Sequence, residues 1–355
     1  MLSVMAIGCG QGEKTVADSN PTSQETTSSE GASDVAGTVE EEEPEVLPEG
    51  KCRSELSGEL IDESLENQRP IAVMIDNESI ALPHYGLTEA DVIYEMMNST
   101  KNGRVTRLMA LVKDWESVER IGNVRSARTT NCILASEWNA ILCHDGGPFY
   151  IDEYVASPSL DNLSGGFARI DNGKSREYTE YITTGEVAQR IKDNNIEREY
   201  NNYYYGEHFK FAREENAIAL TDGADATEVV LPFPHNSTYL TYDESDQLYY
   251  YFEYGAAHLD PANDNAQLSF KNLIIQSAGF EEYDENGYMY YIIENTSGTG
   301  YYITNGKAEE ITWSKGGKLE PTKYFDENGN EIKLNIGKTY VALVPSDSWN
   351  ELEIK

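Results

Sequence analysis

Basic residues are scarce in this chain. Only 27 Lys and Arg stand against 62 Asp and Glu among its 355 residues, so the formal net charge is −35. A surface this acidic repels phosphate backbones and anionic lipid headgroups, which argues against a nucleic-acid partner and against a polybasic membrane patch. An acidic surface also serves solubility alone, and composition does not separate that explanation from a functional one.

Cysteines and long apolar runs are scarce too. The cysteines are Cys9, Cys52, Cys132 and Cys143, and because none forms a C-x-x-C pair, neither a zinc site nor a thioredoxin-type redox pair is predicted. Cys132 and Cys143 stand in apolar surroundings and are expected to be buried thiols. If Cys9 carries lipid, at most one disulfide can form among the others. No stretch of 18 apolar residues occurs, so no transmembrane helix is predicted in the mature chain.

Motifs of catalysis and metal binding are missing as well. The sequence has no G-x-S-x-G elbow, no H-E-x-x-H and no H-x-H, so neither a serine nucleophile nor a metal site is predicted. Cys143 precedes His144 in a predicted strand, where neighbouring side chains point to opposite faces and make a poor nucleophile–base pair. Gly298-Thr299-Gly300 is too short for a dinucleotide loop and favours a β-turn. We therefore expect no cofactor.

Residues 1–9 indicate a signal-peptide remnant. A short apolar run leads into Ala6-Ile7-Gly8-Cys9, a pattern typical of a lipobox, in which a peptidase cuts before the cysteine and a diacylglyceryl group is attached to its sulfur. The basic segment that opens a signal peptide is missing, so we expect the true start codon upstream. The alternative is an ordinary cytosolic N-terminus with a chance cysteine. The pattern predicts lipidation of Cys9.

Residues 10–50 are predicted to form a disordered acidic linker. Residues 10–49 hold 11 acidic residues, one lysine and no aromatic residue. Such a segment cannot bury enough apolar surface to offset its ordering entropy. A flexible spacer directly after a lipidated cysteine is what a membrane-tethered domain requires, so this prediction and that of the lipobox support each other.

Residues 51–200 alternate between apolar runs and helical patterns. The sequence predicts helices at 127–138, from Pro148 onward and at 185–192, and it predicts strands at 71–75, 92–94, 104–112 and 140–143. Strands that alternate with helices indicate an α/β domain with a partly parallel mixed sheet.

Residues 201–355 have a different texture. Tyr-rich segments alternate with turn signals such as Asn305-Gly306, the dipeptide most typical of β-hairpins. We expect hairpin strands at 288–293, 301–304 and 338–344, and hence a mainly antiparallel β (α+β) domain. This domain should separate from the first near residues 195–206. The Tyr runs fit either a sugar-stacking surface or ordinary cross-strand packing.

Polar side chains directly follow several predicted strands. Ligands of open α/β sheets bind at the carboxyl ends of strands, and parallel strands bring those ends to one edge. Arg125 and Arg128 flank the start of a predicted helix, where free N–H groups and the helix dipole already favour anions. The candidate ligand-binding site therefore comprises Asp76, Asn77, Glu95, Arg107, Arg125, Ser126, Arg128, His144, Asp145, Gly146 and Gly147.

Three interpretations of this candidate site stay open. The arginines can pair with Asp76, Glu95 or Asp145 in an internal ion-pair network that only braces the sheet. They can instead bind a carboxylate or phosphate through bidentate hydrogen bonds. The set can also belong to a catalytic site, although no nucleophile accompanies it.

Motifs spread over residues 54–346 carry a family resemblance. The first half contains Arg69–Asn77, Gly86–Glu95, Val105–Arg107, Ile121–Arg128 and His144–Gly147, and the second half contains Lys271–Gln276, Gly298–Gly300, Gly306–Lys307, Trp313–Lys315 and Gly337–Tyr340. These stretches resemble the YerB-like lipoproteins, which have N- and C-terminal domains of the DUF3048 type, labelled as domains of unknown function. Where that family has Pro-His-Asn-x-Tyr, this chain reads Glu177-Tyr178-Thr179-Glu180-Tyr181, so a role of that histidine does not carry over.

The resemblance implies a lipoprotein of a Gram-positive-type bacterium, held on the outer face of the cell membrane by lipid on Cys9, and it implies no particular reaction. Our first hypothesis is a non-catalytic envelope protein that binds a cell-wall component or a wall-synthesis protein through the candidate site. One alternative is a hydrolase or transferase that acts on wall polymer. Another is a solute-capturing lipoprotein, which would need two α/β lobes rather than a β-rich second half.

Overall fold

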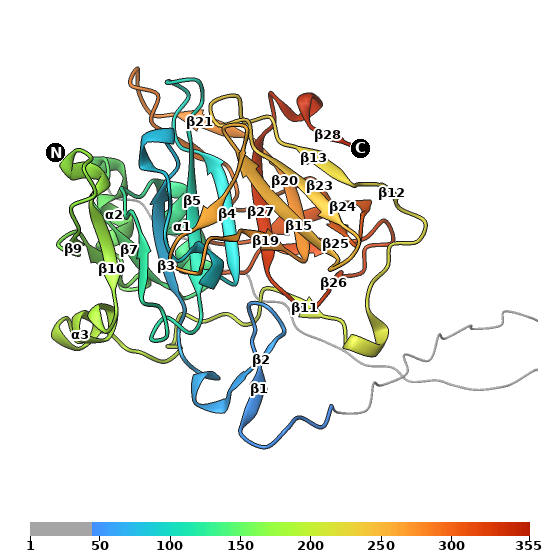
Figure 1. Cartoon of the computed structure of the whole chain (residues 1–355), viewed down its shortest axis with the longest axis horizontal. Coiled ribbons are helices and arrows are strands. Elements are labelled where there is room, and N and C mark those ends of the chain that lie inside the picture. The colour runs from blue at the N-terminus through green and yellow to red at the C-terminus, as the bar shows by residue number, and fades with distance from the viewer. Residues whose placement is uncertain (1–44) are drawn as a thin grey trace, which may run out of the picture. The chain divides into compact units, whose positions relative to one another are not determined.

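A mixed sheet of 11 strands runs through the middle of the molecule (Figure 1). In spatial order its strands are β12 (Ala224–Asp225), β24 (Lys307–Lys315), β23 (Thr296–Thr304), β20 (Asn272–Ala278), β27 (Thr339–Pro345), β4 (Val92–Met97), β5 (Thr106–Val112), β3 (Ile71–Asp76), β7 (Ile141–His144) and β8 (Asn162–Ser164), with β25 (Lys323–Phe325) paired to β24. Strands β3, β7 and β8 are parallel to one another, whereas β5 runs antiparallel between β4 and β3. The predicted mixed sheet of the first half is confirmed.

This computed structural model describes residues 45–355, of which residues 47–355 form one compact unit. The predicted signal-peptide remnant, the lipidation of Cys9 and almost all of the predicted linker at 10–50 lie outside the described residues. Within the described part, no helix is both long and apolar enough to cross a membrane.

The second half of the chain adds an antiparallel sheet of six strands. These are β16 (Ala256–Ala257), β15 (Leu248–Glu253), β14 (Tyr239–Asp243), β13 (Glu228–Val230), β28 (Glu353–Ile354) and β19 (Ser269–Phe270). Asn305-Gly306 makes the predicted hairpin turn, because Thr304 of β23 pairs with Lys307 of β24. The mainly antiparallel character predicted for this half is therefore confirmed.

One predicted hairpin strand is wrong. Strand β27 lies between β20 and β4 and is parallel to both. All seven of its residues are buried, and a continuous apolar run is what a parallel strand covered on both faces requires. Its pairing with β4 joins the two halves in one sheet. Residues 195–206 therefore do not separate two independent compact units, and the exact domain boundary near residue 200 stays a prediction.

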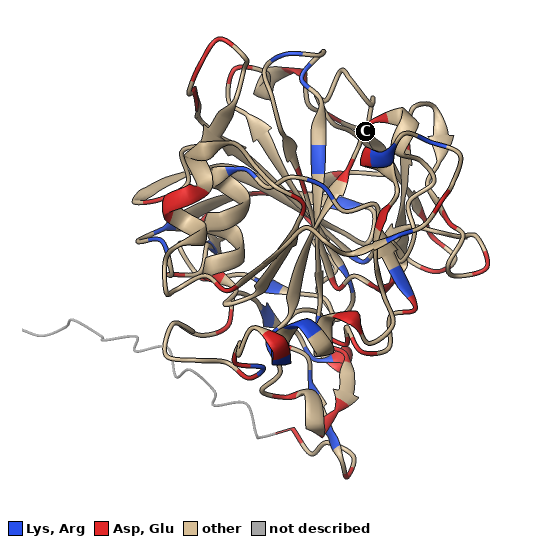
Figure 2. Ribbon diagram, turned by 90° about the vertical axis from the view of Figure 1, so that its left-hand side faces the viewer, with Lys and Arg blue, Asp and Glu red and all other residues tan. Residues whose placement is uncertain are grey.

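Each face of the large sheet has its own covering layer. One face packs against the six-stranded sheet, against β6 (Arg120–Gly122), β10 (Glu180–Thr183) and β9 (Ala168–Arg169), and against helix α3 (Glu186–Asp193). The other face packs against helices α1 (Thr129–Glu137) and α2 (Asp152–Val155) and the hairpin of β21 (Phe280–Glu282) and β22 (Met289–Tyr291). Figure 2 shows the central strands fanned between outer layers, with most charged residues toward the periphery.

The helices follow the prediction in part. Helix α1 lies within the predicted segment 127–138, and all nine of its residues are buried, including Glu137. The helix expected after Pro148 is a single 3-10 turn (Phe149–Ile151) followed by the four residues of α2. Helix α3 lies where it was predicted and buries Val187 and Ile191.

Three short pairs complete the fold: β1 (Lys51–Arg53) with β2 (Leu60–Asp62), β11 (Lys210–Phe211) with β26 (Lys333–Leu334), and β17 (Leu259–Asp260) with β18 (Ala266–Gln267). The three described cysteines, Cys52, Cys132 and Cys143, are buried and free. Burial raises the pKa of the Cys132 and Cys143 thiols to about 12 each, as expected for thiols that only fill space.

Candidate anion-binding site

An ion-paired carboxylate marks the carboxyl end of β3. Asp76 is fully buried, and its Oδ2 accepts a hydrogen bond from Arg125 Nε at 2.5 Å. Arg107 pairs with Asp76 across the antiparallel β3–β5 ladder, and its Nη2 lies 3.6 Å from the same oxygen. The other carboxylate oxygen accepts from the main-chain N–H of Glu78 at 2.9 Å. Asp76 is therefore saturated by its own neighbours.

Two extended segments hold Arg125 at this position. The main chain at Val124 bridges to Ile75, and Arg125 N–H donates to Met74 O at 2.9 Å. On the other side, Asp145 N–H donates to Arg125 O at 3.0 Å, and Ser126 Oγ donates to Asp145 O at 2.9 Å. The segment before α1 is thus fixed between the end of β3 and the loop after β7.

Among Arg107, Arg125 and Arg128, only Arg128 forms no ion pair with a carboxylate of the described residues. It is the N-cap residue of α1, and within the described residues it forms no ion pair. Its Nη1 donates to Ala127 O at 3.0 Å, its guanidinium lies 5.0 Å from the ring centre of Tyr288, and its Nε is buried without a partner. Burial, and then the charge of Arg107, lower the pKa of Arg128 to about 9.

We call Asp76, Arg107, Arg125 and Arg128 the arginine cluster. It holds three cations and one carboxylate, and the Nε atoms of Arg107 and Arg128 are both buried without a partner. Arg125 adds an outer contact, 3.2 Å from Nη2 to Oε2 of the half-exposed Glu177. Because three cations surround one carboxylate, the cluster is chemically suited to a phosphate or carboxylate group.

His144 does not face the arginine cluster as a free base. It is 2% exposed, its Nδ1 lies 2.7 Å from Gly146 O, and its Nε2 lies 3.3 Å from Asn162 Oδ1. Gly146 adopts a φ of +75°, and a Cβ at Gly147 would lie 2.3 Å from Ile151 Cδ1. The His144–Gly147 loop therefore has a structural role, because it holds the main chain of Arg125 and Ser126 in place.

Asp145 takes part in a separate ion pair. Its Oδ2 lies 3.1 Å from Arg169 Nη2, and Arg169 also contacts the buried carboxylate of Glu180. Burial, and then a hydrogen bond with Asp145, raise the pKa of Glu180 to about 6. Sequence reasoning missed Arg169 and Glu180 because they come from two short strands, β9 and β10, that carry no motif.

Asn77 and Glu95 lie on the opposite face of the sheet from the arginine cluster. Successive side chains of a strand point to opposite faces, so Asn77 is turned away from Asp76, and Glu95 follows Ile93 toward the six-stranded sheet. The predicted convergence of all the strand-end residues is wrong in this respect. Strand alternation alone puts Asp76 and Asn77 on opposite faces, whereas the face that Glu95 takes depends on how β4 is placed in the sheet.

Glu95 is the centre of a second polar network, which we call the Glu95 cluster. The carboxylate is fully buried and accepts hydrogen bonds from Tyr340 Oη at 2.6 Å and Tyr251 Oη at 2.9 Å. Burial raises the pKa of Glu95, and the hydrogen bonds that the carboxylate accepts lower it by a smaller amount. The other members donate to Oε1 and are Asn77, Thr106, Asn236 and Thr238.

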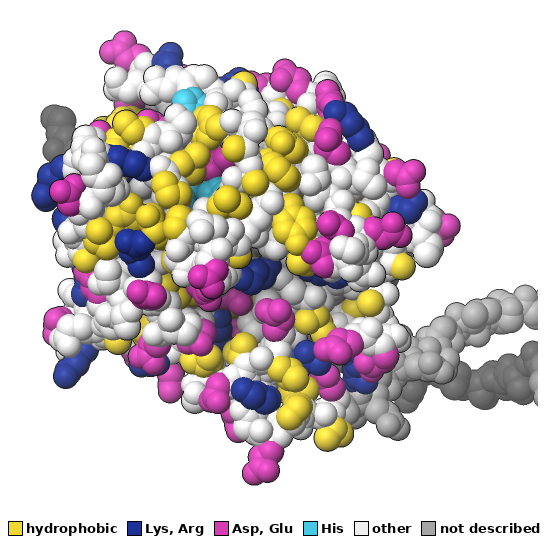
Figure 3. Space-filling model, viewed as in Figure 1, with side chains coloured by type: hydrophobic (Ala, Val, Ile, Leu, Met, Phe, Trp, Pro, Cys, Tyr) yellow, Lys and Arg dark blue, Asp and Glu magenta, His cyan; other side chains and the backbone are white. Residues whose placement is uncertain are grey.

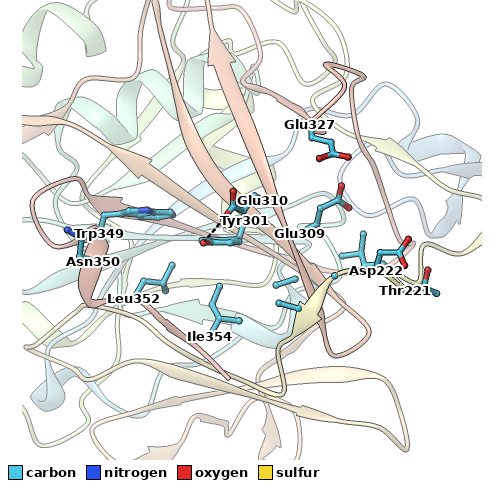
Figure 4. Close-up of a pocket in the computed structure, with 14 residues that line it drawn as sticks. Thr221, Asp222, Tyr301, Glu309, Glu310, Glu327, Trp349, Asn350, Leu352 and Ile354 are labelled. Carbon is cyan, nitrogen blue, oxygen red and sulfur yellow. Dashed lines mark hydrogen bonds between the residues drawn. The ribbon is translucent and has the colours of Figure 1, made fainter.

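A cavity of about 930 Å³ lies elsewhere, in the second half (Figure 4). Tyr301 and Trp349 stack at one end with ring centres 5.8 Å apart, while Glu309 and Glu327 lie toward the other end. None of the predicted site residues lines it. On the face shown in Figure 3, acidic and basic side chains are interspersed. The arginine cluster is therefore a candidate site because its arginines outnumber their carboxylate. It is not marked by a cavity or by a surface region of one charge.

The central mixed sheet and its two covering layers make this a protein with an α/β first half and a β-rich second half. The chain belongs to the family described as "Protein of unknown function (DUF3048)", whose N-terminal domain matches residues 56–197 and whose C-terminal domain matches residues 229–341. The predicted resemblance is confirmed.

A relative and a solved structure make the likeness specific. "Putative lipoprotein YerB" of Bacillus subtilis (strain 168) is 24% identical over 305 residues, which cover 83% of this chain and 87% of the relative. The crystal structure of YerB protein from Bacillus subtilis matches with a TM-score of 0.72 and 21% identity, over 86% of this chain and all of that one. The two proteins therefore share their fold.

Proposed function

We propose that this protein is anchored by lipid to the outer face of the cell membrane and binds an anionic group of a cell-envelope component through Arg125 and Arg128, without catalysing a reaction. The observation that carries the proposal is the excess of cations in the arginine cluster: Asp76 is saturated by two arginines, and Arg128 has no carboxylate. Guanidinium groups in this state favour phosphate or carboxylate by charge-assisted, bidentate hydrogen bonds.

The net charge of −35 limits the kind of anion. A long polyanion would be repelled by the acidic surface, whereas a single phosphate or carboxylate group at the end of a wall fragment feels mainly the nearby arginines. We therefore propose a locally charged ligand, and a wall-synthesis protein that presents such a group remains within the proposal.

Binding should depend on the arginine that the fold does not need. In Arg128→Ala the loss of charge-assisted hydrogen bonds should weaken binding by about 1.5–3 kcal/mol, roughly a ten- to hundredfold rise in Kd. Inorganic phosphate, citrate and soluble wall fragments are the probes, and calorimetric titration is the measurement. Arg198→Ala is the matched control, because Arg198 is exposed and pairs with Glu116 at 2.8 Å. No binding by the wild type, or an equal loss in the control, rejects the site.

The proposed anchor rests on Ala6-Ile7-Gly8-Cys9 and on the word "lipoprotein" in the name of the Bacillus subtilis relative. Protein made in a Gram-positive host should partition into detergent, and Cys9→Ala should return it to the aqueous phase. Equal partition of both forms contradicts the anchor and leaves the binding proposal to be judged by titration.

A hydrolase or transferase has less support. Both ring nitrogens of His144 lie close to main-chain or side-chain oxygens, and the thiols of Cys132 and Cys143 are buried. These groups lack the exposure and the mutual contact that a nucleophile and its base need.

A further inference from the structure

Three side chains that commonly bind metals meet in the interior. His84, Glu253 and His258 are 0%, 1% and 4% exposed, and their ligand atoms all lie within 4.8 Å of one another. Two imidazoles and one carboxylate form a ligand set that zinc takes in proteins. The sequence showed no metal-binding spacing, because His84 comes from the first half and the other two residues come from the second.

The fold holds these side chains in place. Glu253 ends β15, and His258 follows β16 across a tight hairpin, with its N–H donating to Tyr251 O at 3.2 Å. The loop of His84 is fixed to the same region by the buried Asp260, which accepts from Gly86 N–H at 2.9 Å and from Thr88 N–H at 3.0 Å. The approach of His84 is therefore built into the contact between the two halves.

A simple hydrogen-bonded cluster leaves several of the polar atoms unused. His258 Nδ1 lies 2.7 Å from Glu253 Oε1, which satisfies one atom of each residue. Both ring nitrogens of His84, Nε2 of His258 and Oε2 of Glu253 are buried without a hydrogen-bond partner.

The surrounding charge also favours a cation. Glu253 and Glu95 are both buried carboxyl groups, 1% and 0% exposed. Within residues 45–355, neither carboxylate forms an ion pair with Lys or Arg, and Glu253 is hydrogen-bonded to His258. A divalent ion would supply the missing positive charge.

We propose that His84, Glu253 and His258 bind one divalent transition-metal ion, Zn²⁺, in a closed site that joins the two halves of the protein. Small side-chain rotations bring three ligand atoms within 4.8 Å of one another to about 2.1 Å from a single ion. Water or a main-chain carbonyl completes the usual four ligands. The enclosure makes the ion structural, and the site is independent of the arginine cluster.

Zinc uptake by the full chain tests the proposal. Protein treated with EDTA and then freed of chelator is titrated with ZnCl2 against a chromophoric chelator, and the bound metal is counted by mass spectrometry. We expect one Zn²⁺ per chain and a higher Tm with zinc than without. Because His84→Gln and His258→Gln remove direct ligands, the affinity should fall more than the 10–100-fold that loss of an outer partner costs.

Two other histidines provide controls. His235 is half-buried, with Nδ1 2.7 Å from Asn102 O, and His208 is buried and stacked on Trp138, so His235→Gln and His208→Gln should keep the zinc. No zinc uptake by the wild type, or unchanged uptake in His84→Gln, overturns the proposal.

X-ray absorption of the zinc-loaded wild type makes the test independent of how the variants fold. Two imidazoles with oxygen ligands and no sulfur support the site. A sulfur ligand, which would indicate the buried cysteines, overturns it, as does the lack of imidazole ligands.

Discussion

The arginine cluster and the Glu95 cluster stabilise a buried carboxylate in different ways, the first by ion pairs and the second by hydrogen bonds. Asp76 and Glu95 stand in β3 and β4, which run in the same direction on either side of β5, and both are fully buried. Asp76 contacts two arginines, whereas Glu95 accepts hydrogen bonds from neutral side chains alone. The first arrangement leaves cationic donors to spare and is open toward solvent at Arg125, while the second uses its donors inside the core.

The comparison indicates different roles. A carboxylate held by many neutral donors orders the layer between the two sheets, because each donor would otherwise be buried without a partner. A carboxylate that is outnumbered by arginines orients cations and leaves some of them available. The following predictions, from the largest effect to the smallest, test this distinction.

Loss of Glu95 should cause the greatest damage. Glu95→Ala leaves several hydroxyl and amide donors without an acceptor, and since each costs about 1–3 kcal/mol, the free energy of unfolding should fall by about 4 kcal/mol or more. Urea denaturation measures the change. Glu95→Gln keeps one acceptor oxygen and should lose less. An effect under about 1 kcal/mol for Glu95→Ala would contradict a structural role for this cluster.

Loss of Asp76 should cost less and should be reversible by an anion. Removal of one partner from a buried ion pair costs about 3–5 kcal/mol, and we expect about 3 kcal/mol for Asp76→Asn because Arg125 is 20% exposed. Phosphate should raise the Tm of Asp76→Asn more than that of the wild type, since it can replace the lost carboxylate. Glu177→Gln is the control, and its exposed ion pair should contribute under about 1 kcal/mol. Equal phosphate responses would argue against an anion site.

Much of this distinction could not be predicted from the sequence. The apolar runs located β3, β4, β5 and β7, and their shared edge followed from the partly parallel sheet. The alternation of side chains along a strand already predicts that Asp76 and Asn77 point in opposite directions, so their grouping in one site is wrong. Which of the two faces carries Asp76 depends on register.

Long-range pairing was equally hidden in the sequence. The turn signals predict a hairpin strand at 338–344, the segment that forms β27. Its unbroken apolar run is instead typical of a parallel strand in the core. His84 and His258 are 174 positions apart in the chain, and only the joining of the two halves brings them together. Sequence motifs detect metal ligands that lie close together in the chain, on one helix, strand or loop. His84 and His258 lie on different loops, so no motif reveals them.

Glu180 is intermediate between Asp76 and Glu95, because it is a buried carboxyl group that shares one arginine, Arg169, with Asp145. Its pKa is raised to about 6, first by burial and then by the hydrogen bond with Asp145. A carboxyl whose pKa is raised by folding adds stability that is present below its ordinary value of 4.5 and is lost as the pH rises through 6. The contribution is about 1–2 kcal/mol.

Unfolding by urea at a series of pH values from 4 to 7 should therefore show a decline in wild-type stability that Glu180→Gln lacks. The same slope in both proteins would assign it to other groups. A rise in wild-type stability over this range would instead mean that Arg169 dominates and that Glu180 belongs with Asp76.

The smallest expected change separates the members of the arginine cluster. Burial and the charge of Arg107 lower the pKa of Arg128, so below a pH of about 9 the folded state carries this charge at a cost. Arg128→Met removes the charge and keeps most of the packing against Tyr288, so the free energy of unfolding should stay the same or rise by up to about 1 kcal/mol. Arg125→Met should lower it, because Asp76 then keeps Arg107 as its one cation at 3.6 Å. Parallel urea melts of the two variants measure the difference. If Arg128→Met is as destabilising as Arg125→Met, then Arg128 braces the fold, and the cluster has no arginine to spare for a ligand.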